Sequence, residues 1–286
     1  MANRIHIDVT PASIGVDTPG PGRIHLRWLG QAGFWIRSGS TSVVIDPYLS
    51  DALAAKYRGR EVGHERMMPP PIPAGQIAAD WVFCTHRHGD HMDKATLTDL
   101  AAANPRAWLV GPVAEKEFAL GLGLPAGRWV LAAVDERIEL SPAAWAWAIP
   151  SAHETVRLDS AGQPFCVGYV IELAGLRVYH SGDCVPYPGL PDRLAELKVD
   201  IALLPANGRR PELTAKGILG NFFAAEAIEL CRQAGIGTVV LHHWGLFASN
   251  TADPADLAAV ARNNPDVAVI VPDPARQYAL FRGPNP

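Results

Sequence analysis

Three histidines and an aspartate fall within six residues of this chain, in the run His86-Arg87-His88-Gly89-Asp90-His91. The run follows Asp80–Cys84, a short apolar stretch that predicts a buried strand, so the histidines lie on the loop where that strand ends. In such a turn, side chains two residues apart can converge on one cation, while the Asp90-His91 pair turns toward a second. Neutral imidazoles and a carboxylate suit zinc, iron or manganese. The spacing therefore favours a site for two metal ions over a solvated polar loop.

Three further segments each end an apolar run with residues that can bind a metal. They are Trp145–His153, which ends in His153, Leu176–Asp183, which ends in Asp183, and Thr238–Trp244, which contains His242 and His243. Active sites of layered α/β proteins gather at strand ends, so a composite metal site requires this pattern. One such residue alone is more often a cap or turn residue. Four segments in this order predict that the histidines and aspartates meet in one site.

The order His-x-His-x-Asp-His, then His, then Ser-Gly-Asp, then His resembles the metallo-β-lactamase superfamily. Within it, Trp28–Phe34 followed by Ile45–Ser50 is similar to the branch typified by L-ascorbate-6-phosphate lactonase. Further matches to that branch are Pro205–Arg209, Gly220–Phe222 with Glu226, and His243–Phe247. The resemblance runs from about residue 24 to about residue 254. It is much less specific for the substrate than for the superfamily.

The resemblance implies a set of metal ligands. The first metal would be held by His86, His88 and His153, the second by Asp90, His91 and His243, with Asp183 bridging both. His243 is preferred to His242 because an aromatic residue follows the last ligand in this branch, as Trp244 does here. The His242 ring is expected on the opposite face of the strand end. We expect two divalent ions per chain, manganese or zinc: nitrogen-rich ligation favours zinc, whereas the branch favours manganese.

These ligands imply hydrolysis. A water bound between the metals would lose its proton near neutral pH, since its pKa falls from 15.7 to about 7. The hydroxide would attack an electrophilic carbon or phosphorus, and the other metal would collect the developing oxyanion. Asp90 is the expected catalytic residue, because an uncoordinated carboxylate oxygen can orient the nucleophile or move its proton. Asp46 and Thr85 are candidates to fix the imidazole tautomers, with a plain turn role equally open for Asp46.

Substrate-binding residues are less strongly indicated. Asn207 and Arg209 follow an expected strand at 200–204, so their side chains can reach the mouth of the site. Arg209 would take a phosphate or carboxylate by bidentate contact. Tyr48 is a third candidate, ahead of Asn221 and Tyr187. The leading expectation is a hydrolase acting on a small anionic ester, a sugar or sugar-phosphate lactone.

Other activities of this fold remain open or fit less well. Thioester and lactam hydrolases usually carry Gly-Gly after the Asp-His pair, where this chain has Met92-Asp93. Diiron oxidoreductases usually place Glu at the second motif position, where His88 stands. The enzymatic alternative is a phosphodiesterase of the same fold. The alternative from another class is a non-catalytic nucleotide- or RNA-binding regulator, although such a module need not keep a complete ligand set.

The pattern of the chain fits the four-layer αββα sandwich that the resemblance implies, with mixed, mostly antiparallel sheets and residues 1–286 as a single domain. An antiparallel meander is expected over 24–46 and a helix from Asp93. Further strands are expected near 107–110, 128–140, 143–149, 166–173, 176–180, 200–204 and 238–241, with helices from about 113 and at 223–234 and 254–263. The irregular segment 50–80 is expected to be a lid, an oligomer contact or a plain connecting loop.

Composition limits the partners. Hydrophobic residues make up 48% of the chain and charged residues 19%, which excludes global disorder. A net charge of −4 offers no basic footprint for nucleic acid. No run approaches the roughly 20 apolar residues of a membrane span, and the N-terminus does not resemble a signal peptide. We therefore expect a cytoplasmic homo-oligomer with a small anionic substrate. The widely spaced Cys84, Cys166, Cys184 and Cys231 are expected to be free, structural thiols.

Overall fold

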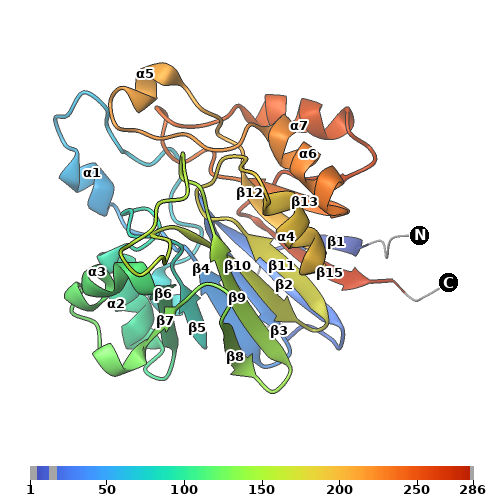
Figure 1. The fold of residues 1–286 in the computed structure, drawn as a ribbon, viewed down its shortest axis with the longest axis horizontal. Coiled ribbons are helices and arrows are strands. Elements are labelled where there is room, and N and C mark those ends of the chain that lie inside the picture. Colours follow the sequence, from blue (N-terminus) through green and yellow to red (C-terminus); the bar gives the residue numbers. More distant parts are fainter. Residues whose placement is uncertain (1–4, 13–17, 284–286) are drawn as a thin grey trace.

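The protein is built in four layers, as seen in a computed structural model that describes residues 5–12 and 18–283 (Figure 1). Two β-sheets, of eight and seven strands, face each other in the middle. Helices α2 (Lys94–Ala103) and α3 (Lys116–Gly121) cover the first sheet, while α4 (Leu190–Glu196), α6 (Ala224–Ala234) and α7 (Pro254–Arg262) cover the second. This is the expected αββα sandwich.

The first sheet combines an antiparallel meander with a parallel half. Its strands, in spatial order, are β1 (Ile5–Pro11), β15 (Arg276–Arg282), β2 (Arg23–Gly30), β3 (Gly33–Ser38), β4 (Thr41–Ile45), β5 (Trp81–Phe83), β6 (Trp108–Pro112) and β7 (Trp129–Ala132). Pairing is antiparallel from β1 to β4 and parallel from β4 to β7. The meander expected over 24–46 is therefore confirmed as β2, β3 and β4.

The second sheet is divided in the same way. Its strands, in spatial order, are β14 (Ala268–Ile270), β13 (Thr238–His242), β12 (Ile201–Pro205), β11 (Leu176–His180), β10 (Val167–Leu173), β9 (Ala144–Pro150) and β8 (Arg137–Ser141). Neighbours from β11 to β14 are parallel, and those from β8 to β11 are antiparallel. Across both sheets the antiparallel pairs exceed the parallel ones only slightly.

The apolar residues form three main cores, one between each pair of layers. Side chains such as Phe34, Phe83 and Tyr169 fill the space between the two sheets. Ile228 and its neighbours pack α6 on the second sheet, and Leu97 packs α2 on the first. In β13, Val240 belongs to the inter-sheet core, whereas Val239 and Leu241 belong to the helix side. This alternation of successive side chains decides where the residues after each strand point.

The parallel strands place several loops at one edge of the sandwich. β9 and β11 are both antiparallel to β10, so they run in the same direction as β12 and β13. The C-terminal ends of β9, β11 and β13 therefore lie at the same edge of the second sheet. β4 and β5 are likewise parallel, so their C-terminal ends share one edge of the first. All candidate metal ligands follow one of these strand ends.

The segment 50–80 is only partly irregular. It contains α1 (Ala52–Lys56) and the 3-10 turn η1 (Ala74–Gln76), and it is tied to the loop after β13 by a hydrogen bond from Met67 N to Leu246 O of 2.8 Å. The other short elements are η2 (Val113–Glu115), η3 (Ala126–Arg128) and α5 (Pro211–Thr214). Helices α1, α4 and α5 and strands β1, β14 and β15 were not expected from the sequence.

All four cysteines are free thiols. Cys84, Cys184 and Cys231 are buried and Cys166 is half-buried. Burial raises the pKa of Cys184 to about 11, and this residue is in neither group of candidate metal ligands among the described residues. Within the same described ranges, no helix is both long enough and apolar enough to cross a membrane.

Candidate metal centre

The first group of candidate ligands gathers residues from three strand ends. His86 and His88 follow β5, His153 follows β9 and Asp183 follows β11. One ligand atom from each of the four lies within 4.8 Å of those of the others. His86 Nε2 and His88 Nδ1 are 2.9 Å apart, and His153 Nε2 is 3.5 Å from Asp183 Oδ2. Residues almost 100 positions apart are thus brought to one point.

The second group consists of Asp90, His91 and His243. His91 Nε2 and His243 Nε2 lie 3.8 and 3.7 Å from Asp90 Oδ2. Asp90 and His91 come from the loop after β5, and His243 follows β13 in the other sheet. The structure therefore brings all seven predicted ligands together in the two groups that the resemblance implies. Whether they bind metal stays a prediction.

Asp183 lies between the two groups. Its Oδ1 is 3.0 Å from His243 Nε2 and 3.3 Å from His91 Nε2, while its Oδ2 faces His153. Asp183 Oδ1 and His91 Nε2 are both buried and make no hydrogen bond within the described part of the chain. Buried polar atoms without a partner are costly, and a divalent cation would satisfy both at once. The residues present thus fit a dinuclear site bridged by one carboxylate.

Asp46 and Thr85 orient two of these imidazoles. Asp46, at the end of β4, accepts hydrogen bonds from Thr85 N (2.7 Å), Thr85 Oγ1 (2.6 Å) and His91 Nδ1 (2.7 Å). Thr85 Oγ1 lies 3.0 Å from His86 Nδ1 and accepts its proton, because its own proton is given to Asp46. These contacts place the proton of His86 on Nδ1, with its Nε2 toward the site, and make His91 Nδ1 a donor to Asp46. Asp46 and Thr85 thus contact two of the candidate ligands, as their expected role in fixing the imidazole tautomers requires.

Gly182 allows the strand end that carries Asp183 to approach Thr85. Its φ is +62°, and a Cβ atom there would lie 2.7 Å from Thr85 Cβ and Oγ1. Any larger residue would push β11 away from the loop after β5. The Ser-Gly-Asp motif thus combines a ligand with the small residue that its placement requires.

We predict that Asp46→Asn weakens metal binding about 10- to 100-fold. The amide nitrogen would replace an oxygen that accepts two protons, so Thr85 and His91 would face a donor and the His91 tautomer would be lost. Competition with a chelator measures the affinity. Asp80→Asn is the matched control, since Asp80 accepts a hydrogen bond from Ser42 N away from the site. Unchanged affinity in Asp46→Asn would contradict this role.

Electrostatics keep three of the candidate ligands in the form that binds metal. Burial lowers the pKa of His153 to about 4 and that of His86 well below its usual value, so both rings are neutral near pH 7. Burial alone would raise the pKa of Asp183, but the facing His243 and His91 hold it well below its usual range. Although burial opposes it, the carboxylates of Asp183, Asp46 and Asp90 raise the pKa of His91. Neutral imidazoles and ionised carboxylates are the forms that bind metal, so His86, His153 and Asp183 are ready to bind, whereas the raised pKa of His91 means that this ring must give up a proton when a metal binds.

Gln31 is a site residue that sequence reasoning missed. It lies in the turn between β2 and β3 with a φ of +50°, and its Nε2 donates to Asp90 Oδ2 at 2.9 Å. The same nitrogen is 3.1 Å from His243 Nε2, and Gln31 O accepts a hydrogen bond from His243 N. A polar residue between two glycines of a hairpin was the available signal, but only the structure shows that it touches the second group.

His242 and His243 point to different places. His242 continues the β13 alternation into the inter-sheet core, where its ring packs on His180 and Phe34 at centroid distances of 4.9 and 5.4 Å. His243 takes a φ of +62°, which turns the chain and places its ring 5.9 Å from that of His91. The structure thus places His243, and not His242, in a candidate ligand group.

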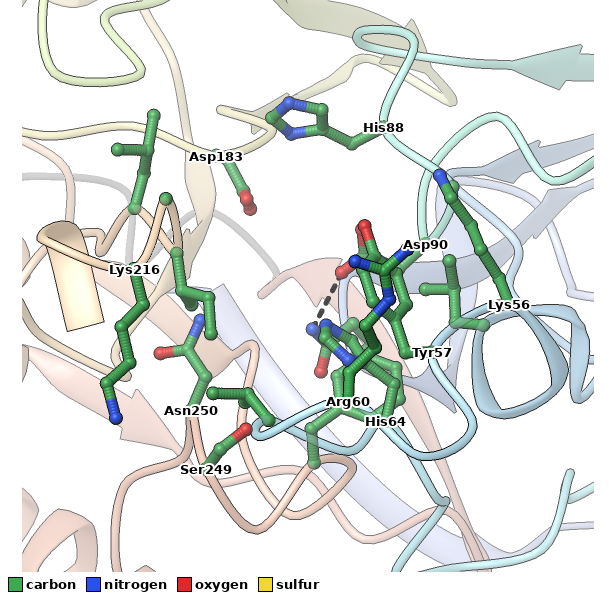
Figure 2. Close-up of a pocket in the computed structure, with 18 of the residues that line it drawn as sticks. Lys56, Tyr57, Arg60, His64, His88, Asp90, Asp183, Lys216, Ser249 and Asn250 are labelled. Carbon is green, nitrogen blue, oxygen red and sulfur yellow. Dashed lines mark hydrogen bonds between the residues drawn. The ribbon is translucent and has the colours of Figure 1, made fainter.

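The two groups open into a cavity of about 650 Å³ (Figure 2). The side of the cavity at the candidate ligands, which we call its floor, is formed by Gln31, His88, Asp90, His153, Asp183 and His243. Four cations line it as well, namely Lys56, Arg60, Arg87 and Lys216. Tyr57 and His64 line it too, so the part of segment 50–80 that follows α1 forms a wall of the cavity. This volume suits a small molecule.

The predicted role of Arg209 is not supported by the structure. Its guanidinium forms a bidentate ion pair with Glu226, at 2.8 and 2.6 Å, and also donates to Asn221 O. It stacks over the Phe223 ring at 4.8 Å and is absent from the described residues that line the cavity. Glu226 also accepts a hydrogen bond from Phe223 N at the start of α6. Arg209 therefore ties its loop to α6 and to Asn221 through three hydrogen bonds from its two terminal nitrogens.

The predicted substrate contacts of Tyr48 and Asn207 are likewise not supported by the positions of these side chains. Tyr48 is fully buried, and its hydroxyl accepts a hydrogen bond from Leu53 N, so it supports α1 from below. Asn207 Nδ2 donates to Asn250 Oδ1 at 2.8 Å. Asn250 lines the cavity, whereas neither Tyr48 nor Asn207 is among the described lining residues. Asn207 therefore contacts a residue of the cavity lining without being among the described lining residues itself.

Comparison with known proteins agrees with this geometry. A family model described as a β-lactamase superfamily domain matches residues 41–244, which hold all seven candidate ligands. A UPF0173 metal-dependent hydrolase of Thermus thermophilus is 27% identical over 241 residues, covering 84% of this chain and 92% of that protein.

Solved structures share the fold. A possible metal-dependent hydrolase from Veillonella parvula has a TM-score of 0.69 and 17% identity, covering 90% of this chain and 99% of that one. An isothiocyanate hydrolase from Delia radicum gut bacteria has a TM-score of 0.70 and 16% identity, covering 88% and 98%. At these identities the likeness shows the fold alone.

Proposed function

The chain belongs to the metallo-β-lactamase superfamily, and on that premise we propose that it is a metal-dependent hydrolase acting on a small anionic ester. The observation that carries the proposal is the position of Asp183 between two His/Asp groups at the floor of a cavity. A similar chain from Thermus thermophilus carries the name metal-dependent hydrolase, which supports the reaction class. The expected substrate is a sugar or sugar-phosphate lactone, as the similarity of Trp28–Phe34 and Ile45–Ser50 to the lactonase branch suggests.

In this proposal seven residues would hold the two metal ions. His86, His88 and His153 would hold one ion and Asp90, His91 and His243 the other, with Asp183 shared. Two bound ions would acidify a water molecule and polarise the ester carbonyl.

Asp90 would accept and transfer the proton, and Gln31 would position its carboxylate. Gln31 fixes Asp90 Oδ2, so the other carboxylate oxygen can accept the proton of the attacking water and pass it to the leaving alkoxide. The Asp46 and Thr85 hydrogen bonds keep the His91 and His86 rings from rotating during this transfer. The cavity walls hold the substrate against the floor, which supplies orientation.

We predict that a panel of plain and phosphorylated lactones, phosphodiesters, thioesters and an isothiocyanate, each tested with Mn²⁺ and Zn²⁺, will show turnover of lactones at least about tenfold above that of the other classes. Lactones suit the site because attack produces a tetrahedral oxyanion that bound cations stabilise. Turnover of phosphodiesters without lactone hydrolysis would replace this proposal with a phosphodiesterase. No turnover at full metal occupancy would instead favour the non-catalytic regulator.

A further inference from the structure

We infer that Lys56, the last residue of α1, and Arg60, in the turn that follows this helix, form the subsite for the anionic group of the substrate. Nothing in the sequence pattern pointed to these residues, and Arg209 was expected in this role. The predicted effect of this subsite on turnover rests on the proposed hydrolase function. Its predicted effect on anion binding does not depend on that function.

The charge balance of the cavity singles out these two residues. Of the four cations that line it, Lys216 is paired with Glu61 at 2.6 Å and Arg87 with Glu115 at 3.6 Å. Within the described residues, Lys56 and Arg60 form no ion pair with a carboxylate. Lys56 Nζ lies only over the Tyr57 ring, 5.2 Å from its centroid. Lys56 and Arg60 are therefore the two cations of the cavity that are not already engaged in an ion pair within the described residues.

A tight turn positions Arg60. Residues 57–60 form a β-turn, in which Arg60 N donates to Tyr57 O at 3.0 Å. Gly59, the third residue of this turn, has a φ of +75°, a conformation that favours glycine. The Tyr57 ring stacks on His64 with centroids 4.1 Å apart, and the His64 ring meets Phe247 at 5.1 Å. These contacts brace the segment against the loop after β13, so the backbone that carries Arg60 is positioned before a ligand arrives. A subsite prepared in this way loses less entropy on binding.

The position of this subsite defines a substrate class. Figure 2 shows Lys56 and Arg60 on the same side of the cavity as Asp90, across from Lys216 and Asn250. An ester bond at the floor and an anion beside Lys56 and Arg60 must belong to different parts of one molecule. A guanidinium takes a carboxylate or a phosphate monoester by two parallel hydrogen bonds, and the ammonium adds a point charge. The substrate is therefore an ester or lactone that carries a phosphate or carboxylate away from its scissile carbonyl.

Matched substrates and variants test the effect on turnover. Glucono-δ-lactone and 6-phosphoglucono-δ-lactone differ by one phosphate. In Arg60→Met and Lys56→Met we expect kcat/KM for the phosphorylated lactone to fall about 10- to 100-fold, mainly through KM, while the plain lactone changes less than about twofold. Arg58→Met is the control, because Arg58 is exposed in the same turn but is not among the described cavity-lining residues. Equal loss on both lactones, or a loss of phosphate preference in Arg209→Met alone, would overturn the inference.

A binding measurement separates this inference from the proposed reaction. Calorimetry with the Mn²⁺-loaded protein compares three ligands that share one carboxylate. Gluconate has no second anion, glucarate has a second carboxylate, and 6-phosphogluconate has a phosphate. We expect 6-phosphogluconate, glucarate or both to bind at least about tenfold more tightly than gluconate, and Arg60→Met with Lys56→Met to remove that difference. The ligand that shows the preference identifies the anion as phosphate or carboxylate. Equal binding of all three to the unmodified protein would refute the subsite, even if lactones are hydrolysed. Preference without lactone turnover would support the subsite and reject the proposed reaction.

Discussion

Replacing Asp183 with asparagine is expected to reduce the metal content from two ions per chain to at most one and to lower hydrolysis about a thousandfold. Asp183 offers one oxygen to each ligand group, with Oδ1 near His91 and His243 and Oδ2 near His153. Asparagine keeps the volume but removes the charge and replaces one oxygen with an amide group that cannot bind a cation. The two ions would then lose their shared anionic ligand and repel each other.

Elemental analysis of protein reconstituted with Mn²⁺ or Zn²⁺ measures the metal content, and kcat with a reactive ester measures the loss. Asp192→Asn is the control, because Asp192 is exposed on α4. The variant should stay folded, since the inter-sheet core is made of apolar side chains that do not include the ligands. Two retained ions with activity within about tenfold of the unmodified protein would show that Asp183 does not bridge the groups.

The second large effect separates two adjacent histidines. His243→Ala is expected to remove the second ion and to reduce activity at least about a hundredfold, because it deletes one of the three ligands of that group. His242→Ala should keep both ions but destabilise the fold by about 2–4 kcal/mol, since it leaves a hole between the sheets. Metal content and thermal unfolding of both variants distinguish a ligand from a core residue.

His242→Leu makes this test sharper. Both ring nitrogens of His242 are buried and lack a hydrogen bond within the described residues, and the ring packs against Phe34. Leucine fills much of the same space without polar atoms, so its stability should equal or exceed that of the unmodified protein. Loss of metal in His242→Leu, or retention of both ions in His243→Ala, would show that the ligand at the end of β13 is wrongly assigned.

The strand ends and the ligand motif could be read from the sequence because both depend on local patterns. Apolar alternation marks the strands, and metal-binding residues follow them at fixed offsets, so the C-terminal ends of parallel strands bring His86, His153 and Asp183 together in any fold of this class. Asp46 could be named for the same reason, because it follows β4 directly.

The sequence predicts the position of a side chain poorly where that position depends on a partner far away in the chain. Arg209 has the right charge and an apparently suitable position, but Glu226 on α6 occupies its guanidinium. Tyr48 is buried under α1, a helix that the sequence pattern did not reveal. β1 and β15 pair residues from opposite ends of the chain, such as Ile5 and Arg282. No local pattern reports such contacts.

The sequence alone therefore indicated the superfamily, the layers and the seven candidate ligands, because its motifs resemble a known family and its apolar runs mark the strands that carry them. Only the tertiary structure decided which cations remain free to meet a substrate. Lys56, at the end of α1, and Arg60, in the turn after it, line the cavity, and the Tyr57 and His64 rings hold this turn against the loop after β13. Arg209 does not line the cavity, because a carboxylate on another helix pairs with it. Whether a charged side chain forms an ion pair depends on its neighbours in the folded structure, and these cannot be read from the order of residues along the chain.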